Sequence, residues 1–149
     1  MSARAPFEDT LARLTAIFEQ RSIPYADRAL RAASFSVEWR RGGPDHPIPL
    51  LLRLRTPGGP EIDVVCATRA WEREIIGRAV RLRLPQALEI PVVAVEDLII
   101  LKLMAGGPGD LADVTDLLER AGPLPELEKR AAARGVLDLL RQVRASTGN

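Results

Sequence analysis

The chain has 149 residues, 46% of them hydrophobic and 28% charged, which is typical of a protein that buries a core, and this length predicts one domain. Its 21 basic and 20 acidic residues leave a net charge of +1, which argues against a nucleic-acid-coating surface or a polybasic membrane tail. The single cysteine, Cys66, excludes an internal disulfide, and the single histidine, His46, excludes a His-rich metal site. No apolar run reaches the ~18 residues of a membrane helix and the N-terminal segment has no signal-peptide core, so we expect a cytoplasmic protein.

The first part of the chain is predicted to form two helices joined by an extended segment. Residues 7–20 carry apolar side chains at helical spacing, which indicates an amphipathic helix. Pro24 disfavours helical backbone at the residue before it, so residues 23–26 are predicted to be extended. Residues 27–33 then have the pattern of a second, short helix.

Three strands are predicted next. Apolar and polar side chains alternate over residues 35–40, as in a half-buried strand. A loop dense in glycine and proline follows at 41–47. Residues 48–55 and 61–67 are predicted to form an antiparallel hairpin around the turn at 56–60.

Helices are predicted to dominate the remainder. Residues 69–79 indicate a helix, and two short extended segments follow at 80–84 and 88–93. Residues 95–105 form the most apolar helical segment of the chain. The glycines and proline at 106–109 lack the Lys-Ser/Thr ending of a phosphate-binding P-loop, so they predict a tight turn between two helices.

Two more helices complete the predicted order. Residues 110–120 form one of them, and Gly122 and Pro123 end it as a glycine and a proline commonly do. Residues 125–144 are predicted to form a single last helix. No repeat or low-complexity linker interrupts the order.

These elements predict an α+β fold: a small mixed β-sheet with an antiparallel hairpin, flanked by helices, with the C-terminal helices packed on the core. We expect one domain over residues 1–149, with an α/β part at 5–94 and the C-terminal helices at 95–145. In this order of elements, the chemistry-bearing side chains fall on one strand and on two consecutive helices.

Glu61 and Asp63 are the first candidates, because residues two apart on a strand share a face. Two adjacent carboxylates repel unless a cation lies between them, so they have the form of half a magnesium site. The alternative is the polar face of a hairpin strand, where they would lie beside Arg53 and Arg55. The spacing alone is compatible with both interpretations.

Lys102, Asp110 and Asp113 are the second group of candidates. A lysine within so apolar a helix must extend to water or meet an acid or a phosphate. Asp110 has the position of an N-cap, and Asp113 lies on the same helix face. The glycine turn would bring these acids near Lys102.

Other chemistry-bearing residues have simpler interpretations. Asp45 and His46 could form an acid–base pair, but the surrounding breakers favour a surface loop. Cys66 is expected to be a small buried side chain on the face of its strand that points to the core. Trp39 and Trp71 are expected to anchor the core.

The run from Ile90 to Asp113, IPVVAVEDLIILKLMAGGPGDLAD, resembles a signature of small bacterial nucleotidyltransferase-fold proteins. These include minimal nucleotidyltransferases and the nucleotidyltransferase toxins and antitoxins of phage-defence loci. Upstream, PEIDVV at 60–65 and AWERE at 70–74 resemble the family's third-carboxylate strand and the helix after it. The similarity covers about residues 23–120, and 92–113 is its most specific part.

The resemblance implies a small sheet flanked by helices, in which three acids hold two Mg²⁺ ions that position a nucleoside triphosphate. It would make Asp63 the third of these acids. Glu61 shares a strand face with Asp63, so it is the second metal ligand that this strand offers. It would make Lys102 and Asp110 a pair on the nucleotide or acceptor side, with Asp113 supporting nucleotide binding.

The chain departs from the family where the first two acids should lie. After the extended segment at 23–26, the family has a Gly-Gly or Gly-Ser loop and an Asp-x-Asp strand. Here residues 27–30 continue directly into a helical pattern that follows this block in relatives. One strand acid cannot hold two metal ions, so only Glu61 and Asp27 remain to rebuild such a site.

Three hypotheses follow. The chain is a catalytically degenerate nucleotidyltransferase-like protein that acts as a nucleotide-binding or partner-binding module, as in a toxin–antitoxin or defence pair. Alternatively, it is an active Mg²⁺-dependent enzyme that moves NMP from NTP to a protein or RNA acceptor through the rebuilt acid site. In the third, the missing strands leave a sheet edge open, which favours a homodimer or a cognate protein partner.

Overall fold

The computed structural model describes residues 29–42, 50–84 and 89–146, together with Thr10 and Leu14. The chain divides into two compact units. Met1–Ala70 and Arg83–Ile90 form the first, named the sheet unit below. Trp71–Leu82 and Pro91–Asn149 form the second, named the helical unit. The sequence placed the internal boundary at residue 94, whereas here a helix N-terminal to that point belongs with the C-terminal helices; the single domain itself stays a prediction.

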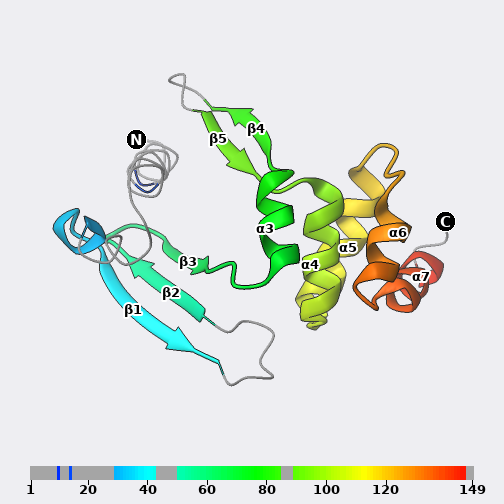
Figure 1. Cartoon of the computed structure of the whole chain (residues 1–149), viewed down its shortest axis with the longest axis horizontal. Helices are drawn as coiled ribbons and strands as arrows, with labels where there is room; N and C mark the ends of the chain where they lie inside the picture. The colour runs from blue at the N-terminus through cyan, green and yellow to red at the C-terminus, as the bar shows by residue number, and fades with distance from the viewer. Residues whose placement is uncertain (1–9, 11–13, 15–28, 43–49, 85–88, 147–149) are drawn as a thin grey trace. The chain divides into compact units, whose positions relative to one another are not determined.

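The sheet unit contains a three-stranded antiparallel sheet in the order β1-β2-β3 (Figure 1). Its strands are β1 at Ser36–Arg41, β2 at Leu50–Arg55 and β3 at Glu61–Val65. The predicted hairpin is confirmed, because β2 and β3 pair around the turn between them. Short connections join consecutive strands, and such connections produce antiparallel pairing.

One face of this sheet carries the core of the unit. Strand alternation turns a set of apolar side chains to this face. The buried strand residues are Val37, Leu52 and Leu54, against which Ile62 and Val64 pack, and Leu14, Leu30, Phe35 and Cys66 from outside the strands complete this core. The prediction for Cys66 is confirmed: its side chain is buried, and burial raises the pKa of its thiol. Trp39 was predicted wrongly as a core residue, since it remains 39% exposed near the end of β1.

A second, two-stranded sheet pairs β4 at Val80–Arg83 with β5 at Glu89–Val92. It follows α3 at Ala70–Gly77, whose only buried residue is Ile75. All four residues of β4 are exposed. The described strands therefore form two antiparallel sheets in place of the one mixed sheet that the sequence predicted.

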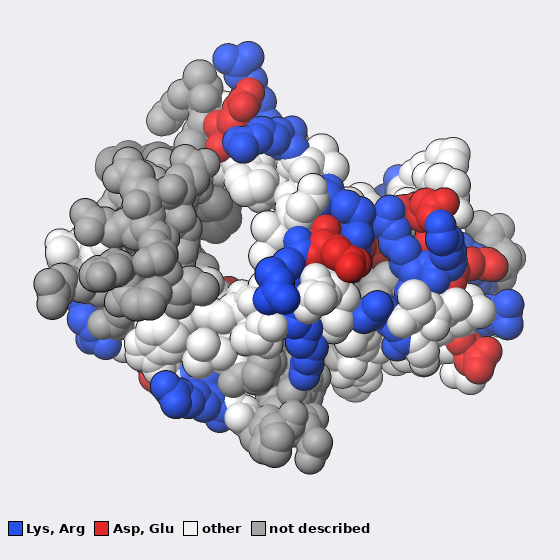
Figure 2. Space-filling model, in the orientation of Figure 1, with Lys and Arg blue, Asp and Glu red and all other residues white. Residues whose placement is uncertain are grey.

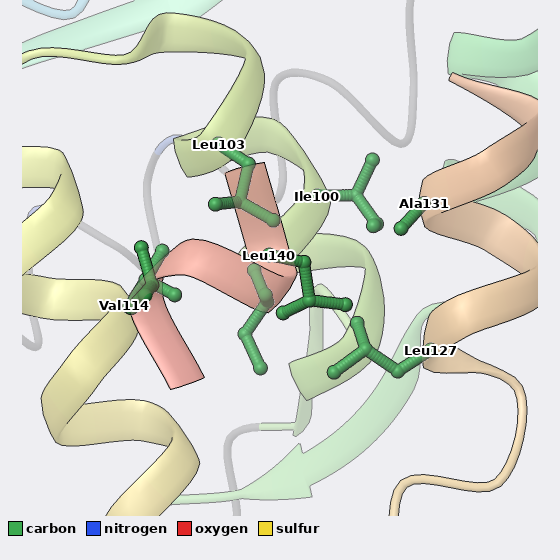
Figure 3. Packing of buried hydrophobic residues seen from close by; sticks show 8 residues of the cluster. Ile100, Leu103, Val114, Leu127, Ala131 and Leu140 are labelled. Atoms are coloured by element: carbon green, nitrogen blue, oxygen red, sulfur yellow. The ribbon is translucent and has the colours of Figure 1, made fainter. Parts of the chain in front are cut away.

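The helical unit has its own apolar core. It is built by α4 at Val95–Ala105, α5 at Pro108–Arg120, α6 at Leu127–Ala133 and α7 at Leu137–Ser146. Figure 3 shows side chains from all four helices converging, among them Ile100, Val114, Ala131 and Leu140. At about 25 cal/mol per Å² of buried apolar area, such side chains supply most of the stability of a small helical unit.

Two helix boundaries differ from the sequence prediction. The predicted helix 125–144 is broken into α6 and α7, because Gly135 adopts a left-handed φ of 71° that ends the first of them. Helix α5 begins at Pro108, two residues before the predicted start, since proline is well suited to the first helical position.

The N-terminal predictions lie largely outside the described residues. This holds for the extended segment 23–26, for most of the loop 41–47, and for the helix 7–20 except at two positions. Thr10 and Leu14 are helical and buried, and residues 29–32 are helical as expected. The α+β class is confirmed. In the part of the chain that the structure describes, no helix is long and apolar enough to span a membrane.

Candidate functional site

The turn between α4 and α5 brings Lys102, Asp110 and Asp113 together. Gly106 ends α4 with a left-handed φ of 68°, and its N–H donates a hydrogen bond to the carbonyl oxygen of Lys102. Gly107 then caps α5. Because this connection is so short, the last turn of one helix lies beside the first turns of the next.

Lys102 is the centre of this cluster. Its Nζ lies 2.6 Å from Oδ2 of Asp113 and 3.4 Å from Oδ1 of Asp110. The hydrogen bond to Asp113, and then that to Asp110, raises the pKa of the lysine, so it stays protonated at neutral pH. The side chain of Lys102 is 25% exposed, whereas that of Asp113 is 58% exposed. The carboxylate of Asp113 therefore faces solvent, whereas Lys102 is largely covered.

Asp110 does not serve as the N-cap that the sequence predicted. Gly107 occupies that position without a side-chain cap, and Asp110 is the third residue of α5. An acid in the first turn still interacts favourably with the positive end of the helix dipole. Its carboxylate turns back toward Gly107, where an added Cβ would come within 3.0 Å of Oδ2.

An open groove of about 250 Å³ adjoins Lys102 and Asp113. Asp116 and Arg120 also line it, and neither residue was predicted from the sequence. Their spacing was the available signal, because positions 113, 116 and 120 share one face of α5. The groove thus presents two cations and two carboxylates.

Glu61 and Asp63 share the polar face of β3, as expected, and arginines of β2 bind both. In the β2–β3 register, Arg53 stands opposite Asp63 and Arg55 opposite Glu61. Arg53 donates two hydrogen bonds of 2.8 Å to the two carboxylate oxygens of Asp63. Arg55 donates one of 2.6 Å to Glu61, and Arg53 also lies 3.0 Å from Glu61.

This pairing changes the electrostatics of the two acids. The hydrogen bonds from Arg53 lower the pKa of Asp63 and raise that of Arg53 itself. The carboxylates are thereby neutralised by guanidinium groups, which occupy the place where a cation would bind. Among the described residues, no group of three or more His, Cys, Asp or Glu side chains is arranged to hold a metal ion.

The site residues therefore fall into two groups. Lys102, Asp110 and Asp113 lie together in the helical unit, and Glu61 and Asp63 lie side by side in the sheet unit. Asp27, Asp45 and His46 lie outside the described residues. No protein-family model matches the sequence, and a comparison with curated proteins finds no similar chain.

Proposed function

We propose that this chain is a nucleotidyltransferase-like protein that has lost nucleotidyl transfer and acts as a nucleotide-binding or partner-binding module. The observation that carries the proposal is the state of the strand acids. Asp63 is the acid that the resemblance assigns to metal. Its two carboxylate oxygens accept hydrogen bonds of 2.8 Å from Nε and Nη2 of Arg53. A metal ion would have to displace a bidentate, charge-assisted pair, which is among the stronger polar contacts in proteins.

The Lys102 groove is the part that supports nucleotide binding. Its lining mixes Lys102 and Arg120 with Asp113 and Asp116, so it is not a plain anion site. A ligand with charges of both signs, such as a nucleoside triphosphate with its own Mg²⁺, fits this mixture. The phosphates would meet the cations and the metal would meet the carboxylates. On this proposal, binding depends on magnesium and on Lys102 but does not depend on Asp63.

Calorimetric titration tests the proposal with each of the four nucleoside triphosphates and Mg²⁺. We expect binding by the wild type and by Asp63→Ala, and at least about tenfold weaker binding by Lys102→Met, since a charge-assisted contact is lost. The chain has only one other lysine, Lys129, which is 81% exposed on α6, so Lys129→Met is the matched control. No binding of any nucleotide would remove the nucleotide-binding role.

An assay with α-labelled NTP tests the loss of transfer, using a cell lysate as the source of protein and RNA acceptors. We expect no labelled product. Transfer by the wild type that Asp63→Ala abolishes would reverse the proposal and favour the alternative, an active enzyme with a rebuilt acid site. The observation that favours this alternative is the close contact of Lys102 with Asp110 and Asp113.

The partner-binding role has a separate support in the sheet. Among the described strands, β1 and β3 each pair with β2 alone. An edge strand offers backbone donors and acceptors to a second chain. Light scattering over a concentration series tests this role, and a dimer or a stable cognate complex is the expected result. A protein that is monomeric at every concentration and that purifies without a partner would count against this role.

A further inference from the structure

A second cavity lies in the helical unit, lined by residues of α3, α4 and α6 and by Arg78 and Arg134, which follow α3 and α6. Its volume is about 100 Å³, below the ~300–1,000 Å³ of sites for whole drug-sized ligands. Three guanidinium groups line it, from Arg78, Arg130 and Arg134. It shares no lining residue with the Lys102 groove. Figure 2 shows basic side chains on either side of acidic ones over these helices.

Two carboxylates, exposed Glu74 and buried Asp97, line the cavity beside these arginines, and the buried acid explains part of the cationic lining. Asp97 is 2% exposed near the start of α4, and its two oxygens accept hydrogen bonds of 2.8 and 3.0 Å from Arg78. A buried carboxylate needs such a partner. Arg78 is therefore committed to Asp97, and Asp97 keeps little capacity to repel an anion in the cavity.

Arg130 is only partly committed. Its Nη2 lies 3.3 Å from Oε2 of Glu96, and its Nη1 lies 3.2 Å from Oδ2 of Asp97. The second contact is an ion pair without hydrogen-bond geometry, because buried Nη1 has no hydrogen-bond partner in the structure. A buried donor without an acceptor destabilises a protein, so native structures normally supply an acceptor. We therefore expect an oxygen atom of a ligand in the cavity to accept a hydrogen bond from Nη1 of Arg130.

Arg134 supplies a second set of donors. Its guanidinium carbon lies 5.2 Å from the centre of the Trp71 ring, so its flat face interacts with the aromatic ring. Such stacking leaves the N–H edge of a guanidinium available to an oxyanion. No carboxylate of the described residues lies within ion-pair distance of Arg134.

We propose that this cavity binds a phosphate group. The cavity has the size of a single oxyanion, and its free donors come from Arg130 and Arg134, four positions apart in sequence. A tetrahedral anion can direct different oxygens to the two guanidinium groups, and paired arginines are typical phosphate ligands. The phosphate can be inorganic phosphate or the terminal group of a small phosphomonoester.

Trp71 provides the readout for a test on the full-length chain. The only other tryptophan is Trp39, so a Trp39→Phe background isolates the emission of Trp71. This protein is titrated with inorganic phosphate, with AMP and with acetate at constant ionic strength. We expect a saturable change with phosphate and with AMP. Equal midpoints mean that the phosphate group suffices, and a tighter AMP midpoint means that a phosphomonoester is preferred.

Two variants in the same background locate the site. Arg134→Gln removes one set of donors, and Arg130→Lys keeps the charge but removes the planar fork; each should weaken phosphate binding at least about tenfold. Arg141→Gln, an exposed arginine on α7, is the matched control and should leave the midpoint unchanged. Lys102→Met should also leave it unchanged, so this result is separable from the fate of the proposed nucleotide site.

Three results would overturn the proposal. The first is no saturable change with either phosphate compound. The second is acetate binding with the same midpoint as phosphate, which would indicate a general carboxylate or anion effect. The third is an equal loss of binding in Arg141→Gln and Arg134→Gln, which would indicate non-specific attraction to net positive charge. Circular dichroism confirms that each variant is folded before it is titrated.

Discussion

Asp63 in the sheet unit and Asp97 in the helical unit are both bound by arginine, but at very different depths. The side chain of Asp63 is 42% exposed, and its bidentate pair with Arg53 lies on the polar face of a hairpin. The side chain of Asp97 is 3% exposed and is shared by Arg78 and Arg130. The same chemical contact therefore has two different physical roles.

Depth decides how much each pair matters. Exposed pairs contribute little, because water and salt screen them and the side chains lose entropy in forming them. Removing one member of a buried pair is costly, because it leaves a charge without its partner in a poorly solvating interior. We infer that the Asp63 pair follows from the register of β3 and adds little to stability, whereas the Asp97 pair is a requirement for the packing of α4.

Substitution of the buried acid should give the largest effect. Asp97→Asn removes the charge that Arg78 and Arg130 face, and we expect it to lower the free energy of unfolding by about 3 kcal/mol, a value reduced because both arginines retain some access to water. Urea denaturation followed by circular dichroism measures this. Asp138→Asn is the control, since that side chain is 92% exposed. Equal, small changes in both variants would break the comparison.

An uncharged substitution in the helical unit, Gly135→Ala, should lower the free energy of unfolding by an intermediate amount. It shows how far this unit responds to a change that removes no charge. Gly135 has a φ of 71°, and a Cβ added there would meet no other atom within 4 Å, so alanine would be strained by its backbone and not by a clash. We expect Gly135→Ala to cost about 1–2 kcal/mol. The same urea titration measures it, with Gly109→Ala, inside α5, as the control that should be neutral or stabilising. A loss as large as that of Asp97→Asn would mean that the helical unit is sensitive to any change.

Local patterns predicted most of the fold because they depend on neighbouring residues. The alternation in β1 and the apolar segment of α4 specified their elements, and the glycine turn placed Lys102 near Asp110. The break between α6 and α7 was missed, because one glycine in a helical pattern does not reveal its φ. The hairpin was predicted without its register, and it is the register that sets Asp63 opposite Arg53.

The second cavity was missed for a related reason. An acid within the apolar run of α4 was visible as Asp97, but its partners Arg78 and Arg130 lie 19 residues before it and 33 residues after it. Charge pairs at such separations depend on tertiary packing, which spacing along the chain does not encode. An acid in so apolar a segment nevertheless signals a distant cation, because a buried charge is rarely left unpaired.

Acid titration of the exposed pair should give the smallest effect and complete the comparison. Because Arg53 lowers the pKa of Asp63, the folded protein holds this carboxylate ionised to lower pH than the unfolded chain does. The resulting stability is present above the unfolded pKa of ~3.9 and is lost as pH falls through the lower folded value.

Asp63→Asn should therefore lower the melting temperature at pH 7 by no more than a few degrees, and this difference should vanish below that window. Melting curves between pH 2 and 7 measure it, with Asp138→Asn as the control. A difference that persists unchanged at the lowest pH would mean that Asp63 acts through packing or hydrogen bonding that does not require its charge, and the pair would then be less distinct from that of Asp97 than its exposure suggests.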